Sequence, residues 1–339
     1  MTAVVPAVYQ VPRSLRAAID NIEIGPDADW AVIAGYRIED TDRRVLRVRL
    51  SDAIYGTLHA GREIDPDQRL PRRIRDTEFE RMLTENTPQR HFQVSVRVRE
   101  LAQERPDGTT RILVGRDGVR MWVPVERIDT ESYTAGDEVL MQASALRPAV
   151  SPGFFFVHGT TPFRRGPDLL RVYIHISDSN AAPRIWRRVL EFLEAREVSY
   201  RAKVLSSPLL YSRRDALVVY LAPQFDDVVT ELAELVTGTN GTGGETSLFA
   251  ERIAPGVSIA WEPRDPRPEM TGLSFGQHRA SAIAGALLDA ACGIGDLYEL
   301  LTAEFIAAGI DPAHPARNLT VGRLPADTSD TEQPDESQR

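Results

Sequence analysis

A single lysine, Lys203, is the residue whose type points most directly to chemistry. The chain carries 40 basic residues, and all of the others are arginines. A guanidinium keeps its proton at physiological pH, whereas a lysine amine becomes a base when burial or nearby positive charge lowers its pKa. Lysines with perturbed pKa values gather at functional sites, so Lys203 is a candidate general base. A drift towards arginine that left one lysine behind is the alternative interpretation.

A histidine lies on a second predicted strand. Residues 171–177, RVYIHIS, alternate apolar and polar side chains with the two-residue period of a strand. This period puts His175 on the polar face together with Arg171, Tyr173 and Ser177. An imidazole titrates near neutral pH and could donate a proton there, although a half-buried structural histidine is an equally ordinary interpretation.

Two further predicted strands carry Lys203 and a tyrosine. The segments 200–205, YRAKVL, and 216–222, ALVVYLA, have the same two-residue period. This period fixes the face of its strand on which each of Lys203 and Tyr220 lies. If both strands pair with the strand of His175 in one sheet, the three side chains can meet. His158, at the end of the apolar run FFFVH, is the competing acid, but it could equally hydrogen-bond the GTTP loop that follows it.

Several other classes of site are excluded by composition and spacing. The six histidines show neither HExxH nor a CxxC partner, so we expect no metal, and the scheme requires no cofactor. The loop GTNGTGGET lacks the lysine and hydroxyl residue of a phosphate-binding loop. A net charge of -9 and the lack of a basic stripe argue against nucleic acid as a partner.

We expect a cytoplasmic protein that does not enter a membrane, because the sequence shows neither an apolar span nor a signal segment. The lone cysteine, Cys292, should be a core residue.

The order of helical and strand patterns predicts the α+β class. Residues 1–148 combine helical segments with the strand HFQVSVRVRE and a hairpin turning at GRDG, and they should form a small N-terminal α+β domain. Residues 149–324 should form a second α+β domain, with a mostly antiparallel sheet flanked by helices. The polar, acidic residues 325–339 have nothing to bury and should be a disordered tail.

The motifs of the second half, taken in order, resemble a known family. FFFVHGTTPF, RVYIHIS, AKVLSSPLLYSRRDALVVYL, LSFGQHRA and FIAAGIDPAHP are similar to the HopA-type effector family and its relatives in lanthipeptide and thioamitide biosynthesis. GRDGVRMWVPV and SPGFFFVHG also look like that family. More distantly, the chain is similar to type III secreted phosphothreonine lyases and to the lyase domains of class III and IV lanthipeptide synthetases. The resemblance implies a lyase that eliminates phosphate from phosphoserine or phosphothreonine, leaving dehydroalanine or dehydrobutyrine.

The resemblance also implies roles for individual residues. It makes Lys203 the catalytic base, His175 the acid and Tyr220 a supporting residue, and its implied phosphate-binding arginines are Arg213 or Arg214 of YSRRD and Arg279 of SFGQHRA. The secreted lyases carry a second lysine two residues before the acid histidine, where this chain has a tyrosine.

The predicted substrate is a phosphorylated, ribosomally made precursor peptide. Because the chain has no kinase motif, we expect a separate kinase of the aminoglycoside-phosphotransferase type to phosphorylate this peptide. The N-terminal domain should help to dock that kinase or the leader of the peptide. One alternative is a non-catalytic phosphopeptide-binding subunit of a kinase complex. Another is an effector that acts on host phosphoproteins.

Overall fold

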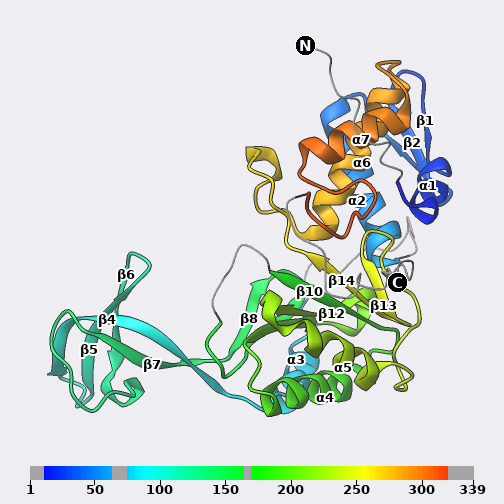
Figure 1. The fold of residues 1–339 in the computed structure, drawn as a ribbon. Coiled ribbons are helices and arrows are strands. Elements are labelled where there is room, and N and C mark those ends of the chain that lie inside the picture. The colour runs from blue at the N-terminus through cyan, green and yellow to red at the C-terminus, as the bar shows by residue number, and fades with distance from the viewer. Residues whose placement is uncertain (1–10, 63–74, 164–168, 320–339) are drawn as a thin grey trace, which may run out of the picture.

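Three antiparallel sheets organise the chain, and helices surround the largest of them (Figure 1). The computed structural model describes residues 11–62, 75–163 and 169–319. Within these residues the protein is α+β, with antiparallel sheets flanked by helices, as the sequence predicts. The predicted acidic tail lies outside the described residues.

The largest sheet has seven strands in the order β13-β14-β10-β12-β11-β9-β8. In chain order these strands are β8 (Leu146–Ser151), β9 (Phe154–His158), β10 (Leu170–Ile176), β11 (Tyr200–Leu205), β12 (Arg213–Leu221), β13 (Glu251–Ala254) and β14 (Val257–Trp261). The strands β10, β12 and β11 are neighbours, so the strands of His175, Tyr220 and Lys203 do pair in one sheet.

One face of this sheet is covered by α3 (Thr77–Glu85), α4 (Ala182–Ala195) and α5 (Asp226–Val236) (Figure 1). In α4, apolar residues recur at helical spacing and form the stripe that is buried against the sheet: Ile185, Trp186, Val189, Leu190 and Leu193. This face is apolar and holds the larger hydrophobic core.

The opposite face packs against a second core that joins the two ends of the described chain. This core includes α2 (Arg43–Ile54), α6 (Phe275–Ala291) and α7 (Leu297–Ala307). Helix α2 continues into a π-helical turn, η1 (Tyr55–Ala60), a form that recurs at functional sites. Helix α6 begins at a capping box, in which Ser274 and Gln277 satisfy each other's backbone amides.

Several further elements are short. They are α1 (Arg13–Asp20), the three-stranded sheet of β1 (Glu23–Ile24), β2 (Trp30–Ile33) and β3 (Tyr36–Glu39), and the 3-10 turns η2 (Val125–Arg127), η3 (Pro208–Leu210), η4 (Pro223–Phe225) and η5 (Pro268–Met270).

A four-stranded sheet projects from the rest of the molecule (Figure 1). Its strands are β4 (His91–Glu104), β5 (Thr110–Arg116), β6 (Val119–Pro124) and β7 (Glu138–Ser144). The predicted hairpin is confirmed: Asp117 and Gly118 both have positive φ, 49° and 81°, as a tight two-residue turn requires. The first residue of β4, His91, pairs with the last residue of β7, Ser144, so the sheet's entry and exit lie side by side.

The hydrophobic clusters show how the first half of the chain packs. Residues of the projecting sheet form a core of their own, whereas α1, α2 and their neighbours share a core with α6 and α7. The domain boundary at residue 148 stays a prediction. The expectation for Cys292 is wrong: it follows the last turn of α6 and is exposed, because the helix's buried stripe ends before it. Within the described residues, no helix has the length and apolar character needed to cross a membrane.

Candidate functional site

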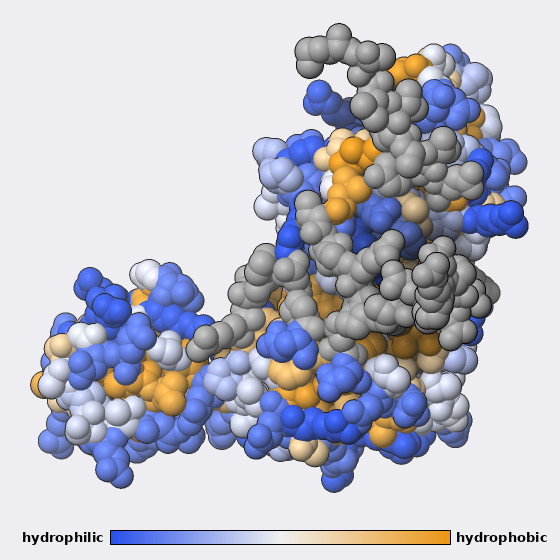
Figure 2. Space-filling model, in the orientation of Figure 1, coloured by the Kyte–Doolittle hydropathy of each residue, from blue (hydrophilic) through white to orange (hydrophobic). Residues whose placement is uncertain are grey.

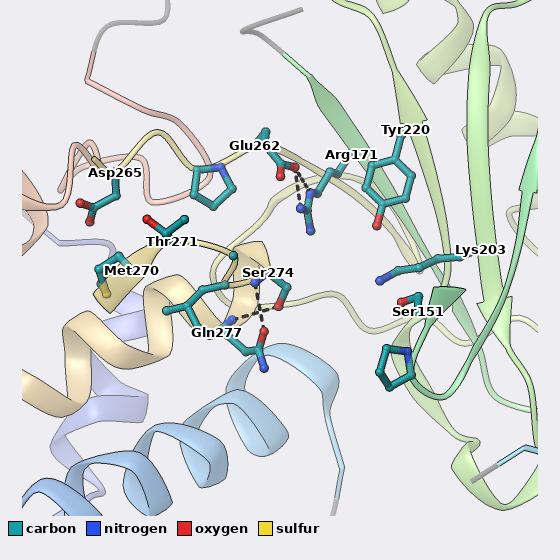
Figure 3. A pocket seen from close by; sticks show the side chains of 14 residues that line it. Ser151, Arg171, Lys203, Tyr220, Glu262, Asp265, Met270, Thr271, Ser274 and Gln277 are labelled. Carbon is teal, nitrogen blue, oxygen red and sulfur yellow. Dashed lines mark hydrogen bonds and ion pairs between the residues drawn. The ribbon is translucent and has the colours of Figure 1, made fainter. Parts of the chain in front are cut away.

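A cavity of about 490 Å³ lies between the large sheet and the loop that leads into α6 (Figure 3). The sheet contributes polar side chains from β10, β11 and β12, and residues 262–277 contribute most of the rest of the lining. Its lining residues are Ser151, Pro152, Arg171, Lys203, Tyr220, Glu262, Pro263, Asp265, Met270, Thr271, Gly272, Leu273, Ser274 and Gln277. Two of the predicted site residues, Lys203 and Tyr220, are therefore brought together at one cavity.

Lys203 is half-buried and reaches into this cavity from β11 (Figure 3). Its Nζ lies 4.0 Å from the centre of the Phe154 ring and 6.0 Å from the centre of the Tyr220 ring. Electron-rich ring faces attract a cation at such distances. The amine thus lies over the Phe154 ring, with the Tyr220 ring farther away.

Arg171 is a site residue that sequence reasoning did not nominate. It pairs with Tyr220 across β10 and β12, and its guanidinium carbon lies 5.2 Å from the centre of that ring. Its Nε and Nη2 lie 2.6 and 2.5 Å from Glu262 Oε2. The signal was present, because the strand period puts Arg171 on the polar face of His175.

A buried polar cluster lies on the other side of Lys203. Arg213 forms a two-point ion pair with Asp215, with Nε–Oδ1 and Nη2–Oδ2 distances of 2.7 Å. Arg213 also donates to the Tyr55 hydroxyl at 2.7 Å, and that hydroxyl donates to Asp215 at 3.1 Å. Burial alone would raise the pKa of Asp215, but Arg213, with smaller contributions from His59 and Lys203, holds it well below its usual range. The guanidinium fork of Arg213 is thus occupied by protein groups.

The π-helical turn η1 contributes a second member of this cluster, His59. Its Nδ1 lies 2.7 Å from Ser247 Oγ, and its Nε2 lies 3.8 Å from Asp215 Oδ2. Burial lowers the pKa of His59 to about 4, so the ring is neutral at pH 7. The array of serine, histidine and aspartate is buried, and its groups hold η1 against the sheet.

His175 lies at a register shift between β10 and β12, away from the residues that line the cavity. Its Nε2 is 2.8 Å from Ser212 Oγ. Burial lowers the pKa of this histidine, while the nearby carboxylate of Glu245 opposes the shift. Glu245 is also held by Arg214, at 2.9 Å from its Nη2. Lys203 and His175 share a sheet face, and their roles as base and acid stay a prediction.

Arg279 is completely buried in the first turns of α6. Its Nε donates to the carbonyl oxygen of Pro315 at 3.0 Å, and its Nη1 donates to Nδ1 of His278 at 3.0 Å. His278 Nε2 in turn lies 3.0 Å from Asp265, whose carboxylate borders the cavity. Burial lowers the pKa of His278 to about 4, so its neutral ring links the guanidinium of Arg279 to the carboxylate of Asp265.

His158 stacks against Phe92, with ring centres 4.3 Å apart and planes 3° from parallel. It stands at the junction between the large sheet and β4, outside the cavity lining. Its role as the competing acid stays a prediction. Within the described residues, no group of three or more histidine, cysteine or acidic side chains is arranged to hold a metal ion.

The fold and site define an α+β protein with a half-buried lysine at a polar cavity that also holds an arginine and a tyrosine. The model of the HopA1 effector protein family matches residues 145–317, just over half of the chain. This protein belongs to the HopA1 effector protein family, and the resemblance stated from its motifs is confirmed.

Two solved structures of effector proteins are similar to this chain. The effector from Pseudomonas syringae pv. tomato strain DC3000 is 18% identical, with 49% of this chain and 62% of that chain covered and a TM-score of 0.39. The effector from Pseudomonas syringae pv. syringae strain 61 is 14% identical, with 71% and 80% covered and a TM-score of 0.43. The match spans less than two thirds of the first effector. No curated protein matches the chain.

Proposed function

We propose that this protein is a lyase that eliminates phosphate from phosphoserine or phosphothreonine in a ribosomally made precursor peptide. Lys203 takes the α-proton, the electrons of that C–H bond form the Cα–Cβ double bond, and the Cβ–O bond to phosphate breaks. The products are dehydroalanine or dehydrobutyrine and free phosphate. The observation that carries the proposal is the single lysine amine at the edge of an open cavity that an arginine also lines.

The surroundings of Lys203 suit a base that acts beside a phosphate. Arg171 shares the cavity and Arg213 lies across the Phe154 ring, 5.7 Å from its centre. The guanidinium of Arg171 can attract a phosphorylated substrate to the cavity that Lys203 also lines.

The remaining roles follow the resemblance and are part of the proposal. His175 protonates the departing phosphate oxygen, with His158 as its competitor, and Tyr220 supports the base from the cavity wall. The resemblance implies Arg213 or Arg214 and Arg279 as phosphate ligands, whereas in the structure the forks of Arg213 and Arg279 contact protein groups. His175→Asn should slow elimination about 100-fold or more, whereas His158→Asn should have a small effect. The opposite ranking would make His158 the acid.

The decisive experiment incubates the purified protein with a phosphothreonine peptide and follows loss of phosphoric acid by mass spectrometry. Lys203→Ala and Lys203→Arg should both lower the rate by about 100-fold or more, since the arginine keeps the charge and loses the base. Arg196→Lys, at a surface ion pair with Glu231, is the matched control and should keep full activity. Intact phosphopeptide with the unaltered protein would refute the lyase proposal.

Two other functions are separated by the same assay. A non-catalytic phosphopeptide-binding subunit would bind the peptide through its arginines and leave it intact. The family's description as effectors favours a third possibility, action on host phosphoproteins. A protein of that kind would eliminate phosphate from folded phosphoproteins faster than from a precursor peptide.

We further propose that a separate kinase of the aminoglycoside-phosphotransferase type supplies the phosphopeptide and docks on the projecting sheet of β4–β7. This sheet has a core of its own, and the space-filling view shows hydrophobic residues along its middle, bordered by hydrophilic ones (Figure 2). Two apolar residues of this sheet, Val119 and Leu140, are exposed at 58% and 41%.

The docking proposal is tested by replacing residues 93–142 with a short Gly-Ser linker. Because His91 and Ser144 are paired, the shortened chain can close without strain. Elimination from free phosphopeptide should persist, while co-purification with the kinase should be lost. Retained kinase binding by the shortened chain would contradict the proposal.

A further inference from the structure

Arg171 differs from the other three arginines proposed as phosphate ligands in where its guanidinium lies. Among the described residues, it is the arginine that lines the cavity of Lys203 and Tyr220 (Figure 3). The forks of Arg213 and Arg279 are directed at Asp215 and at backbone carbonyls. Arg214 contacts Glu245 outside the cavity lining. A phosphate that enters beside Lys203 therefore meets Arg171 first.

The strand and its neighbours hold Arg171 rigidly. Its side chain is 8% exposed, and the Tyr220 ring lies beneath the guanidinium at 5.2 Å. A planar guanidinium that is packed on a ring loses little freedom when it binds an anion. Ser274 and Gln277, at the start of α6, line the same cavity, so the positive end of that helix adds to the attraction.

The present partner of Arg171 is an exchangeable carboxylate. Both contacting nitrogens converge on one oxygen of Glu262, Oε2, so the pair is not the two-oxygen fork that Arg213 makes with Asp215. The Glu262 side chain is 36% exposed and can turn towards solvent. Asp265, the other acid in the lining, already contacts Arg267 and His278, at 2.7 and 3.0 Å. A phosphate dianion carries more charge and more acceptor oxygens than a carboxylate, so it competes favourably for the fork.

We infer that Arg171 is the receptor for the substrate's phosphate and that Glu262 is the internal anion which the phosphate displaces. This inference rests on the proposed function, because it assigns the phosphate subsite of the same cavity. Glu262 holds the arginine in place in the free protein and sets a threshold for binding: a neutral or singly charged ligand does not displace it.

The test measures binding of a fluorescent phosphothreonine peptide by anisotropy. All proteins in this arm carry Lys203→Ala, so that the peptide is not consumed. Arg171→Met should weaken binding about tenfold or more, since a charge-assisted phosphate contact is lost. Glu262→Gln should strengthen binding by about threefold or more, because the competing charge is gone. Glu262→Gln should have no effect when Arg171→Met is already present.

The surface pair Arg196 and Glu231 provides the control, as Arg196→Met and Glu231→Gln should leave binding unchanged. The gain from Glu262→Gln cannot arise from misfolding, so it decides the matter if Arg171→Met does not fold. Unchanged affinity in Glu262→Gln, or full affinity in folded Arg171→Met, would overturn the inference.

A second arm separates this inference from the proposed function. Proteins with Lys203 intact are assayed for loss of phosphoric acid. Binding that depends on Arg171 without any elimination would leave the receptor standing and remove the lyase. Elimination that is insensitive to Arg171→Met and Glu262→Gln would leave the lyase standing and remove the receptor.

Discussion

Lys203 and Phe154 are in face contact, with the lysine Nζ 4.0 Å from the centre of the ring. The ring belongs to β9, which pairs with the lysine's own strand, so the sheet fixes the distance. A base must meet its proton within a narrow range of positions, and small displacements are costly. Phe154 is therefore a positioning residue for Lys203 in the proposed reaction.

Phe154→Leu should lower kcat about tenfold and leave KM little changed, because the leucine lacks the flat ring face that fixes the position of the lysine's end. Steady-state kinetics with a phosphothreonine peptide would measure both constants. The control is Phe155→Leu, on the opposite face of the same strand, where the ring packs on Trp186. That variant should lose stability and keep kcat. An unchanged kcat in Phe154→Leu would contradict the positioning role.

Asp215→Asn should destabilise the protein by about 3–5 kcal/mol, because it leaves the charge of Arg213 buried without its partner. Urea unfolding at pH 7 would measure the change in the free energy of unfolding. The double variant Arg213→Met with Asp215→Leu removes both charges and should lose less stability than the single variant. Equal losses in the two proteins would show that packing, and not the ion pair, dominates.

The stability of the protein should fall between pH 6.5 and about 4 because of buried neutral histidines. The pKa of His59 is lowered to about 4 from an ordinary 6.5, so in this range the unfolded chain binds a proton that the folded chain does not. Acidification then favours unfolding, by at most about 1.4 kcal/mol per pH unit for each such histidine. His278, also lowered to about 4, should add a similar slope.

Urea unfolding at pH 7, 6 and 5 checks this dependence. His59→Gln should flatten the slope, since a glutamine does not titrate. His314→Gln is the matched control, because that side chain is 61% exposed. A slope that is the same with and without His59 would show that this ring is not the titrating group.

Much of the architecture could be predicted because local patterns decide it. The alternating patterns of RVYIHIS and YRAKVL form the strands β10 and β11. The Asp-Gly hairpin forms as predicted, because both turn residues adopt the positive φ that such a turn requires. The packing of α2 onto α6 could not be predicted, since no local pattern encodes contacts between residues more than two hundred positions apart.

The sequence predicts which residue types form the site better than it predicts which side chains contact one another there. Lys203 and Tyr220 reach one cavity because strand period and pairing suffice to place them. Arg213 meets Asp215 only two residues along its own strand, whereas the partner of Arg171 depends on long-range packing, because Glu262 follows the end of another strand. The strand period puts Arg171 on the polar face of His175, but its place at the cavity depends on the packing of the loop before α6, which no local pattern encodes.

Arg279 offers a final test, because its contacts predict a structural role while the resemblance implies a phosphate ligand. Its guanidinium donates to the carbonyl oxygens of Pro315 and Arg317 and ties that segment to α6. Arg279→Lys cannot reach all of these acceptors, so we expect the free energy of unfolding to fall by about 2–3 kcal/mol, with KM for phosphopeptide unchanged. Thermal unfolding and kinetics on the same preparation would separate the two roles. A KM raised about tenfold at unchanged Tm would instead show that Arg279 contacts the phosphate.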